Sequence, residues 1–261
     1  MSKTILITGA TDGIGLLSAR KLTEFGHRVL LHGRSAEKLA DAAAQIGGSP
    51  STYCADLSRI SDVASLADAV LTDHARLDVL INNAGILKTP IVQTEAGRDI
   101  RFDVNAIAPY LLTKRLLPII PKDGRVINLS SAAQAPVDLG AMAKYQPMGD
   151  MEAYAQSKLA ITIWSAVLAK ALPDGPSVFA VNPGSLLATK MVKEGFGLAG
   201  NDLNIGADIL VTATLDPDWV DRSGRYFDND SGRFAPAHPA AMDESHVNDV
   251  MRVLSDISET V

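Results

Sequence analysis

Short apolar runs alternate with longer helical patterns along most of the chain. Continuous apolar runs predict strands at 5–7, 29–31, 52–55, 78–82, 125–129, 177–181 and 226–227. Helical spacing or composition predicts helices at 14–25, 35–46, 99–117 and 151–172. Strands without polar alternation are typical of a sheet buried on both faces, and strands separated by helices favour parallel βαβ units. The pattern therefore predicts an α/β fold, a doubly wound parallel sheet in three αβα layers.

No linker divides the chain, so 1–261 is expected to form a single domain. Its least regular stretches, 132–151 and 185–204, each follow a predicted strand. Irregular segments after strand ends are where doubly wound folds place the loops that contact ligands. Both stretches are therefore candidates for the walls of a binding site.

Composition narrows the class of partner. Of 261 residues, 47% are hydrophobic and 21% charged, which is ordinary for a globular protein. Lys and Arg number 24 against 30 Asp and Glu, and a net charge of −6 disfavours nucleic acid and anionic membrane surfaces as partners. The chain has no apolar run of membrane-spanning length, and its start lacks a signal-peptide pattern.

Cysteine and histidine usage gives no sign of a metal site. The single cysteine, Cys54, excludes an internal disulfide framework and a thiolate metal cluster, and the five histidines form no ligand motif. We expect no metal, a reducing, cytoplasmic compartment, and a Cys54 side chain that packs as a small buried residue at a strand end.

Three glycines, Gly9, Gly13 and Gly15, fall between the first predicted strand and the first helix. A loop without side chains lets backbone N–H groups approach a pyrophosphate, and a helix N-terminus favours its charge. The spacing differs from G-x-G-x-x-G, and the loop lacks the lysine of a P-loop. A tight turn that needs positive φ is the alternative. The context favours dinucleotide binding, and with it a Rossmann-type fold.

The residues after the second strand bear on which dinucleotide binds. An acidic residue there would bind a ribose 2′-hydroxyl, whereas an arginine accommodates a 2′-phosphate. The stretch His32-Gly33-Arg34-Ser35 has no carboxylate and has an arginine, which favours NADP(H), with NAD(H) as the alternative. Arg34 could otherwise be an exposed cation at a helix start.

The spacing Tyr154-x-x-x-Lys158 places both side chains on one face of a predicted helix. A nearby ammonium favours the phenolate and would lower the pKa of Tyr154, which suits proton transfer. Most Tyr-x-x-x-Lys pairs lie on an ordinary helix surface, so this pair is evidence for a catalytic site only in combination with other motifs of the chain.

Four motifs together resemble those of the short-chain dehydrogenase/reductase family. In chain order they are Thr8-Gly9-x-x-x-Gly13-x-Gly15, Asn82-Asn83-Ala84-Gly85, Ser130-Ser131 and Tyr154-x-x-x-Lys158. Asn105 and Pro183-Gly184 also stand where the family has an active-site asparagine and a Pro-Gly turn. The resemblance implies a Rossmann fold, a nicotinamide cofactor and a small-molecule carbonyl or alcohol substrate.

The resemblance also implies a role for each matching residue. Tyr154 would be the general acid in reduction and the base in oxidation. Lys158 would lower the pKa of Tyr154 and bind the nicotinamide ribose. Ser131, rather than Ser130, would hydrogen-bond the substrate oxygen, and Asn105 would hold a water. The implied cofactor-binding residues are Gly9, Thr11, Asp12, Gly13, Ile14, Gly15, Arg34, Asp56, Leu57, Asn82, Ala84, Gly85, Tyr154, Lys158, Pro183, Gly184 and Thr189.

Two departures from the family pattern concern the substrate side. The gap between Ser131 and Tyr154 is wider than in most relatives, which marks 132–151 as an insertion. Similar insertions occur in the branch that resembles retinol dehydrogenases and protochlorophyllide reductases, and we take this as kinship and not as a sign of the substrate. The segment after Pro183-Gly184 is a residue longer than the common pattern, and 185–204 is expected to be a mobile substrate loop.

The residues, together with the family resemblance, favour an NADP(H)-dependent oxidoreductase that transfers a hydride between nicotinamide and a carbonyl or alcohol. The alternatives are an NADPH-binding regulatory module and a non-redox enzyme, an epimerase or lyase, on the same fold. The family commonly assembles through its two long helices, so a homodimer or homotetramer is expected. The alternative is that the apolar face of 151–172 packs only on its own sheet.

Overall fold

The structure, a computed structural model, describes residues 2–259. Within this range, strands form one eight-stranded sheet in the order β3-β2-β1-β4-β5-β6-β7-β8. Their bounds are β1 (Thr4–Ile7), β2 (Arg28–Gly33), β3 (Thr52–Cys54), β4 (Val79–Asn82), β5 (Arg125–Leu129), β6 (Ser177–Asn182), β7 (Tyr226–Asp228) and β8 (Arg233–Ala235). All neighbouring pairs are parallel except β7 and β8. This order reverses between β1 and β4, where doubly wound sheets bind their ligands.

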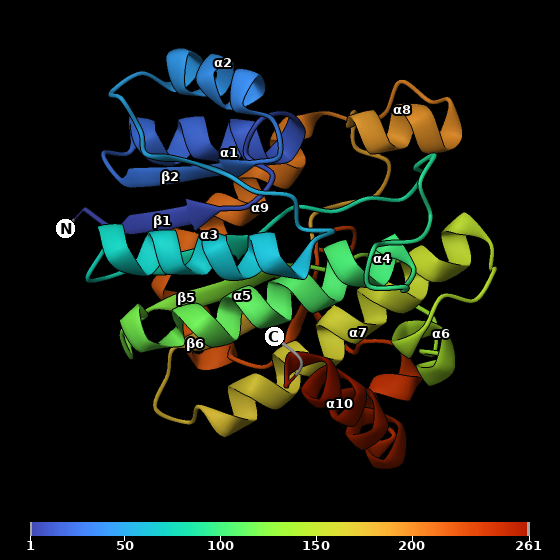
Figure 1. The fold of residues 1–261 in the computed structure, drawn as a ribbon. Helices are drawn as coiled ribbons and strands as arrows, with labels where there is room; N and C mark the ends of the chain where they lie inside the picture. Colours follow the sequence, from blue (N-terminus) through green and yellow to red (C-terminus); the bar gives the residue numbers. More distant parts are fainter. Residues whose placement is uncertain (1, 260–261) are drawn as a thin grey trace.

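Helices cover both faces of the sheet (Figure 1). They are α1 (Gly13–Glu24), α2 (Ala36–Ile46), α3 (Ile60–Asp73), α4 (Ile100–Phe102), α5 (Ala108–Leu116), α6 (Leu139–Ala143), α7 (Asp150–Ala171), α8 (Lys190–Phe196), α9 (Leu203–Leu215) and α10 (Glu244–Ser258). A π-helical segment, η1 (Asp103–Ile107), joins α4 to α5, and short 3-10 turns lie at η2 (Leu117–Ile119), η3 (Pro217–Arg222) and η4 (Pro239–Met242).

The core divides into two clusters because side chains of a strand alternate between faces. Ile5 and Ile7 of β1 pack with α1, α2 and α9, whereas Leu6 packs with α3, α5 and α7. All three side chains are fully buried. The three αβα layers confirm the predicted fold class.

Three of the longer helices lie where no element is predicted. In α3 the buried residues Val63, Leu66 and Val70 recur at helical spacing, and in α10 Val250, Leu254 and Ile257 do the same. Helix α9 is apolar around most of its circumference, so its periodicity is weak. The predicted helix at 99–117 exists as α4, η1 and α5 in succession.

The two irregular stretches contain short helices. The stretch 132–151 holds α6 and the start of α7, and 185–204 holds α8 and the start of α9. Tyr226 and Phe227 are buried on β7. Cys54, which was expected to be buried, is exposed instead, because its side chain alternates with that of the buried Tyr53 on the short edge-side strand β3. Within residues 2–259, no helix combines the length and the apolar character that a membrane crossing requires.

Candidate active site

The segments that follow β1, β4, β5 and β6 meet at the carboxyl edge of the sheet, and most of the predicted site residues lie on them. The glycine loop links β1 to α1. Gly9 and Gly13 have φ of +65° and +55°, a region that favours glycine. A Cβ on Gly15 would lie 2.3 Å from the carbonyl oxygen of Gly9, so that position accepts no side chain.

Helix α1 begins without a side-chain cap. Its N-cap residue, Asp12, makes no capping hydrogen bond, and its carboxylate lies instead 3.9 Å from the Lys38 ammonium. The first N–H groups of a helix have no partner within the helix. The loop therefore offers uncapped backbone donors beside glycines that leave room for an anion, a combination that fits a pyrophosphate.

Three polar side chains hold the glycine loop in place. The Asn83 amide donates to the carbonyls of Thr8 and Gly9, at 2.8 and 2.9 Å. The Thr8 hydroxyl accepts from the N–H groups of Asn83 and Ala84, at 3.0 and 3.1 Å. The N–H of Gly9 donates to Nδ1 of His32 at 3.3 Å. Asn83 and Thr8 stand within the motifs of the sequence, but their bonds join segments far apart in the chain.

His32 is a neutral link between β2, β3 and the glycine loop. Burial lowers the pKa of His32 to about 4. Since Nδ1 accepts from Gly9, we assign the proton to Nε2, which lies 3.1 Å from the carbonyl oxygen of Ala55. The histidine therefore fixes the loop only in its uncharged form.

The predicted 2′-phosphate contact lies at the end of β2. Arg34 is exposed, and no ion pair is recorded for it within residues 2–259. Position 33 has no space for a side chain, because a Cβ there would lie 2.5 Å from Cγ2 of Thr11. Farther along, Asp56 is half-buried and accepts from the N–H of Ser58 at 2.9 Å, while Leu57 is buried.

The end of β4 adjoins the predicted catalytic residues. The amide of Asn82 donates to Thr113 at 3.1 Å and to Asn128 at 2.8 Å, so this buried side chain is engaged within the protein. A Cβ on Gly85 would lie 3.4 Å from both Oδ1 of Asn105 and Nζ of Lys158. Gly85 therefore stands directly beside the lysine.

Helix α7 carries Tyr154 and Lys158, and the end of β5 carries the serine pair. Nζ of Lys158 donates to the carbonyl of Leu129 at 2.7 Å and lies 5.5 Å from the centre of the Tyr154 ring. The Ser131 side chain lies close enough to Tyr154 to lower the pKa of its hydroxyl. Ser130 is buried, with its hydroxyl 2.6 Å from that of Thr162, whereas Ser131 is half-exposed.

The pKa values of this pair differ from the sequence expectation. Burial raises the pKa of Tyr154, and the nearby Ser131 hydroxyl opposes that rise only in part. Burial also lowers the pKa of Lys158 to about 7. The expected lowering of the Tyr154 pKa by its lysine is therefore absent: the pKa of Tyr154 is raised, and burial is the largest cause.

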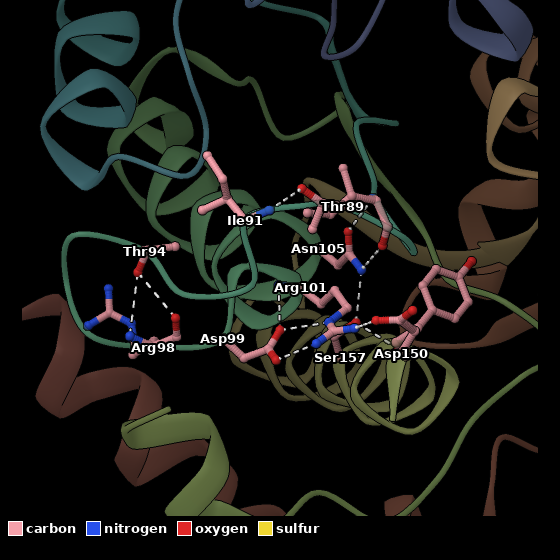
Figure 2. Close-up of polar contacts among 11 residues, drawn as sticks. Thr89, Ile91, Thr94, Arg98, Asp99, Arg101, Asn105, Asp150 and Ser157 are labelled. Carbon is pink, nitrogen blue, oxygen red and sulfur yellow. Dashed lines mark hydrogen bonds and ion pairs between the residues drawn. The ribbon is translucent and has the colours of Figure 1, made fainter. Parts of the chain in front are cut away.

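Asn105 lies in the π-helical segment η1, and its side chain connects η1 to the segment after β4 and to helix α7 (Figure 2). Its amide donates to the Ile86 carbonyl at 2.9 Å and to the Ser157 hydroxyl at 3.0 Å, and its oxygen accepts from the Ile86 N–H at 2.8 Å. Ser157 in turn donates to the carbonyl of Tyr154 at 2.7 Å. The Asn105 side chain thus connects the β4 loop to the turn of α7 that carries Tyr154.

The segment after β6 brings α8 over the glycine loop. Gly184 has a φ of +122° after Pro183, and Thr189 caps α8 by accepting from the N–H of Val192 at 3.2 Å. A Cβ on Gly13 would lie 3.9 Å from Cγ2 of Thr189. In Figure 1, α8 stands apart from the layers, at the same end of the molecule as the site. The Thr189 methyl therefore faces the loop expected to bind the cofactor.

Comparisons with known proteins agree with this arrangement. The family model described as short chain dehydrogenase matches residues 3–196. Human retinol dehydrogenase 13 is 31% identical, over 93% of this chain and 80% of its own length. A metagenomic short-chain oxidoreductase in complex with NADP has a TM-score of 0.63 at 32% identity, covering 81% of this chain and 90% of its own. The 3-ketoacyl-(acyl-carrier-protein) reductase of Brucella melitensis, complexed with NADH, has a TM-score of 0.68 at 25% identity, covering 88% and 98%.

Proposed function

The chain belongs to the short-chain dehydrogenase family, in its retinol dehydrogenase branch, and is an oxidoreductase that uses a nicotinamide cofactor; we propose that the cofactor is NADP(H) and that Tyr154 is the acid and base of the reaction. The substrate would be a small carbonyl compound or the corresponding alcohol. The observation that carries the proposal is the meeting of Ser131, Tyr154 and Lys158 at the carboxyl edge of the sheet, beside Gly85.

The residues at this edge fit a dinucleotide. The uncapped start of α1 and the glycines of the preceding loop would receive the pyrophosphate. Lys158 would hydrogen-bond the nicotinamide ribose. Its Nζ lies beside Gly85, which has no side chain to separate it from a bound cofactor. When bound, the nicotinamide supplies or takes up the hydride.

The chain itself handles the proton. In reduction, the Ser131 and Tyr154 hydroxyls would donate hydrogen bonds to the substrate oxygen, and the Tyr154 proton would pass to it as the alcohol forms. A raised pKa keeps Tyr154 protonated at neutral pH, as this role requires. In oxidation the Tyr154 phenolate would accept the alcohol proton, and Lys158 would stabilise that charge.

The end of β2 supports NADP(H) over NAD(H). Arg34 is exposed and available to a 2′-phosphate, and Lys38 lies on the first turn of the following helix. No carboxylate occupies 32–35, and Gly33 leaves no room for one without displacing Thr11. The positive charge of Arg34 and Lys38, with no carboxylate at 32–35, is what supports a preference for NADP(H) over NAD(H).

The remaining predictions concern the whole chain. We propose that 1–261 acts as one nucleotide-binding domain, with 132–151 and 185–204 as the walls of the substrate site. A cytoplasmic location and a homo-oligomer stay predictions. The buried Ile161, Ile163 and Trp164 of α7 are covered by this chain alone, which leaves less of that helix for a partner than expected.

The test is the consumption of NADPH and NADH with a panel of aldehydes and ketones, for the wild type and Tyr154→Phe. We expect turnover with NADPH by the wild type and a loss of roughly 10²–10⁴-fold in kcat for Tyr154→Phe, the size of a general acid's contribution. NADPH binding, followed by fluorescence, should survive the substitution. Undiminished turnover by Tyr154→Phe would refute its role. A wild type that binds NADPH and reduces nothing would favour a regulatory module or a non-redox enzyme.

A further inference from the structure

The main-chain carbonyl of Ser131 accepts hydrogen bonds from two side chains outside the four motifs. Gln134 donates from Nε2 at 2.9 Å, and Tyr226 donates from its hydroxyl at 3.1 Å. Tyr226 is buried on β7, whereas Gln134 belongs to the segment that follows β5. The segment after β5 and the first residue of β7 therefore both donate a hydrogen bond to this one carbonyl.

Gln134 also connects Ser131 to the C-terminal part of the chain. Its Oε1 accepts from the N–H of His238 at 2.9 Å, just before the turn η4. A second tie runs from the N–H of Val137 to Nε2 of His246 on α10, at 3.2 Å. The segment that begins with Ser131 is thus anchored on residues that lie far beyond the known motifs in the sequence.

The carbonyl contacts bear on the direction of the Ser131 hydroxyl. That hydroxyl accepts from the N–H of Ala133 at 3.1 Å and lies close enough to Tyr154 to lower its pKa. Its position depends on the Ser131 Cα, which moves with the adjoining peptide plane. Because the carbonyl is held by two donors, the plane cannot turn without leaving buried polar groups unpaired.

We propose that Gln134 and Tyr226 are positioning residues for Ser131: by holding its carbonyl, they aim its hydroxyl at the substrate oxygen and at Tyr154. This inference rests on the proposed function, because it assigns Ser131 to the reaction. Displacement of a reacting group by about 1 Å can cost on the order of 10²-fold in rate, so a modest shift of Ser131 would be measurable.

Tyr226 can be substituted so that its hydrogen bond is lost and its ring is kept. Gln134 and Tyr226 line a hollow of about 280 Å³ together with Asp228, Ala235 and His238. Tyr226→Phe keeps the ring that forms the wall and removes only the donor. Tyr53→Phe is the control, because it also removes a hydroxyl that is hydrogen-bonded within the protein, here to Asp73 at 2.9 Å and His74 at 2.8 Å, on the strand β3 at the opposite edge of the sheet.

Steady-state kinetics gives the first readout. Tyr226→Phe should lower kcat by roughly 10-fold, less than the ~10²-fold expected for Ser131→Ala, which removes a donor to the developing charge outright. KM and NADPH affinity should stay within about twofold, since neither residue contacts the glycine loop. Tyr53→Phe should leave kcat unchanged. If thermal melting shows that Tyr226→Phe does not fold, Gln134→Met, which also removes one donor, carries the same expectation.

The pH profile of alcohol oxidation separates positioning from general loosening of the fold. The Ser131 hydroxyl lowers the pKa of Tyr154, so moving or removing this hydroxyl should shift the rising limb of the rate to higher pH. Lys158, which faces the Tyr154 ring and whose pKa burial lowers to about 7, is kept in every variant, so its own titration is common to all of them. Tyr226→Phe and Ser131→Ala should therefore shift the limb in the same direction, and Tyr53→Phe should not shift it. In a Ser131→Ala background, Tyr226→Phe should cost nothing further.

Each contrary result has a definite meaning. Wild-type kcat and pH profile in Tyr226→Phe, with activity lost in Ser131→Ala, would overturn the positioning role and leave the proposed function standing. A full additional loss in the double variant would also overturn it. If the wild type turns over no substrate, or if Ser131→Ala is fully active, the proposed function has failed and this inference fails with it.

Discussion

His32 couples the charge of one buried side chain to the stability of the fold. Burial lowers the pKa of His32 to about 4, against about 6.5 for an exposed histidine. As pH falls, the unfolded chain binds this proton first, so stability that is present above pH 6.5 is lost as the pH approaches 4. The difference between the two pKa values corresponds to about 3 kcal/mol.

We therefore expect the free energy of unfolding to fall by up to about 3 kcal/mol between pH 7 and pH 4 through His32 alone. Urea titrations at several pH values would measure the fall. His32→Asn keeps an acceptor near the position of Nδ1 and does not titrate, so its stability should depend less steeply on pH. Burial also lowers the pKa of His27 and His74, which leaves the variant with a residual slope. Equal slopes for the wild type and His32→Asn would refute the assignment.

Arg34 should decide the choice of cofactor at the level of one side chain. Charged hydrogen bonds are worth about 1.5–3 kcal/mol, so Arg34→Ala should weaken NADPH binding by roughly 10-fold or more. NADH binding should change little, because it has no 2′-phosphate. Arg20→Ala, which removes an exposed arginine paired with Glu24 on α1, should leave both affinities unchanged. A loss of equal size for NADPH and NADH would show that Arg34 does not read the 2′-phosphate.

At the scale of elements, a buried ion pair fixes α4 and the start of α7 (Figure 2). The Arg101 guanidinium donates to both carboxylate oxygens of Asp99, at 2.8 and 2.6 Å, and its remaining nitrogen pairs with Asp150, the first residue of α7. Arg101 and Asp99 are both buried. Two further links, Asn105 to Ser157 and Ser157 to the Tyr154 carbonyl, continue this connection along α7.

Arg101→Leu should therefore be strongly destabilising. It leaves the Asp99 carboxylate buried without its cation, and breaking a buried pair in this way costs about 3–5 kcal/mol. Arg252→Leu removes an equivalent pairing with Asp249 on the surface of α10 and should cost less than about 1 kcal/mol. Urea denaturation of both variants at pH 7 gives the comparison. A loss near 1 kcal/mol in Arg101→Leu would mean that Asp99 finds another partner or takes up a proton.

The sequence predicts the sheet well because its strands are continuous apolar runs. The predicted 125–129 coincides with β5, and 5–7 and 29–31 lie inside β1 and β2. Helix ends were predictable where a side chain caps them, as Ser35 does for α2. The π-helical turn at Asn105 has no local signature, since it depends on the bonds of that side chain to Ile86 and Ser157.

The sequence predicted which residues belong to the candidate site better than it predicted the contacts among them. The glycine loop and the Tyr154–Lys158 spacing are local patterns, and the topology then brings their segments to one edge. The bond from Tyr226 to the Ser131 carbonyl joins residues 95 positions apart, and no periodicity reveals it. The direction of the shift in the Tyr154 pKa likewise depends on burial, which the spacing between two residues cannot reveal.

At the scale of the whole molecule, the proposed cofactor site is built from segments that lie far apart in the sequence. The glycine loop, the end of β4 and the segment before α8 approach one another around Gly9, Gly85 and Thr189. A ligand that binds only the folded state stabilises it by mass action, so NADPH should stabilise the entire fold.

At a hundredfold excess over its Kd, NADPH should add about 2.7 kcal/mol to the free energy of unfolding, and at about 2–4 °C per kcal/mol this raises Tm by roughly 5–10 °C. Differential scanning fluorimetry measures the shift. Tyr154→Phe should retain it, since the proton donor is not needed for binding. Gly15→Ala should abolish it, because the new methyl would lie 2.3 Å from the Gly9 carbonyl, whereas Gly149→Ala adds a methyl that meets nothing within 4 Å and should keep it. Equal shifts with NADPH and NADH at the same concentration would contradict the role of Arg34, and no shift with either would contradict the glycine loop as the dinucleotide site.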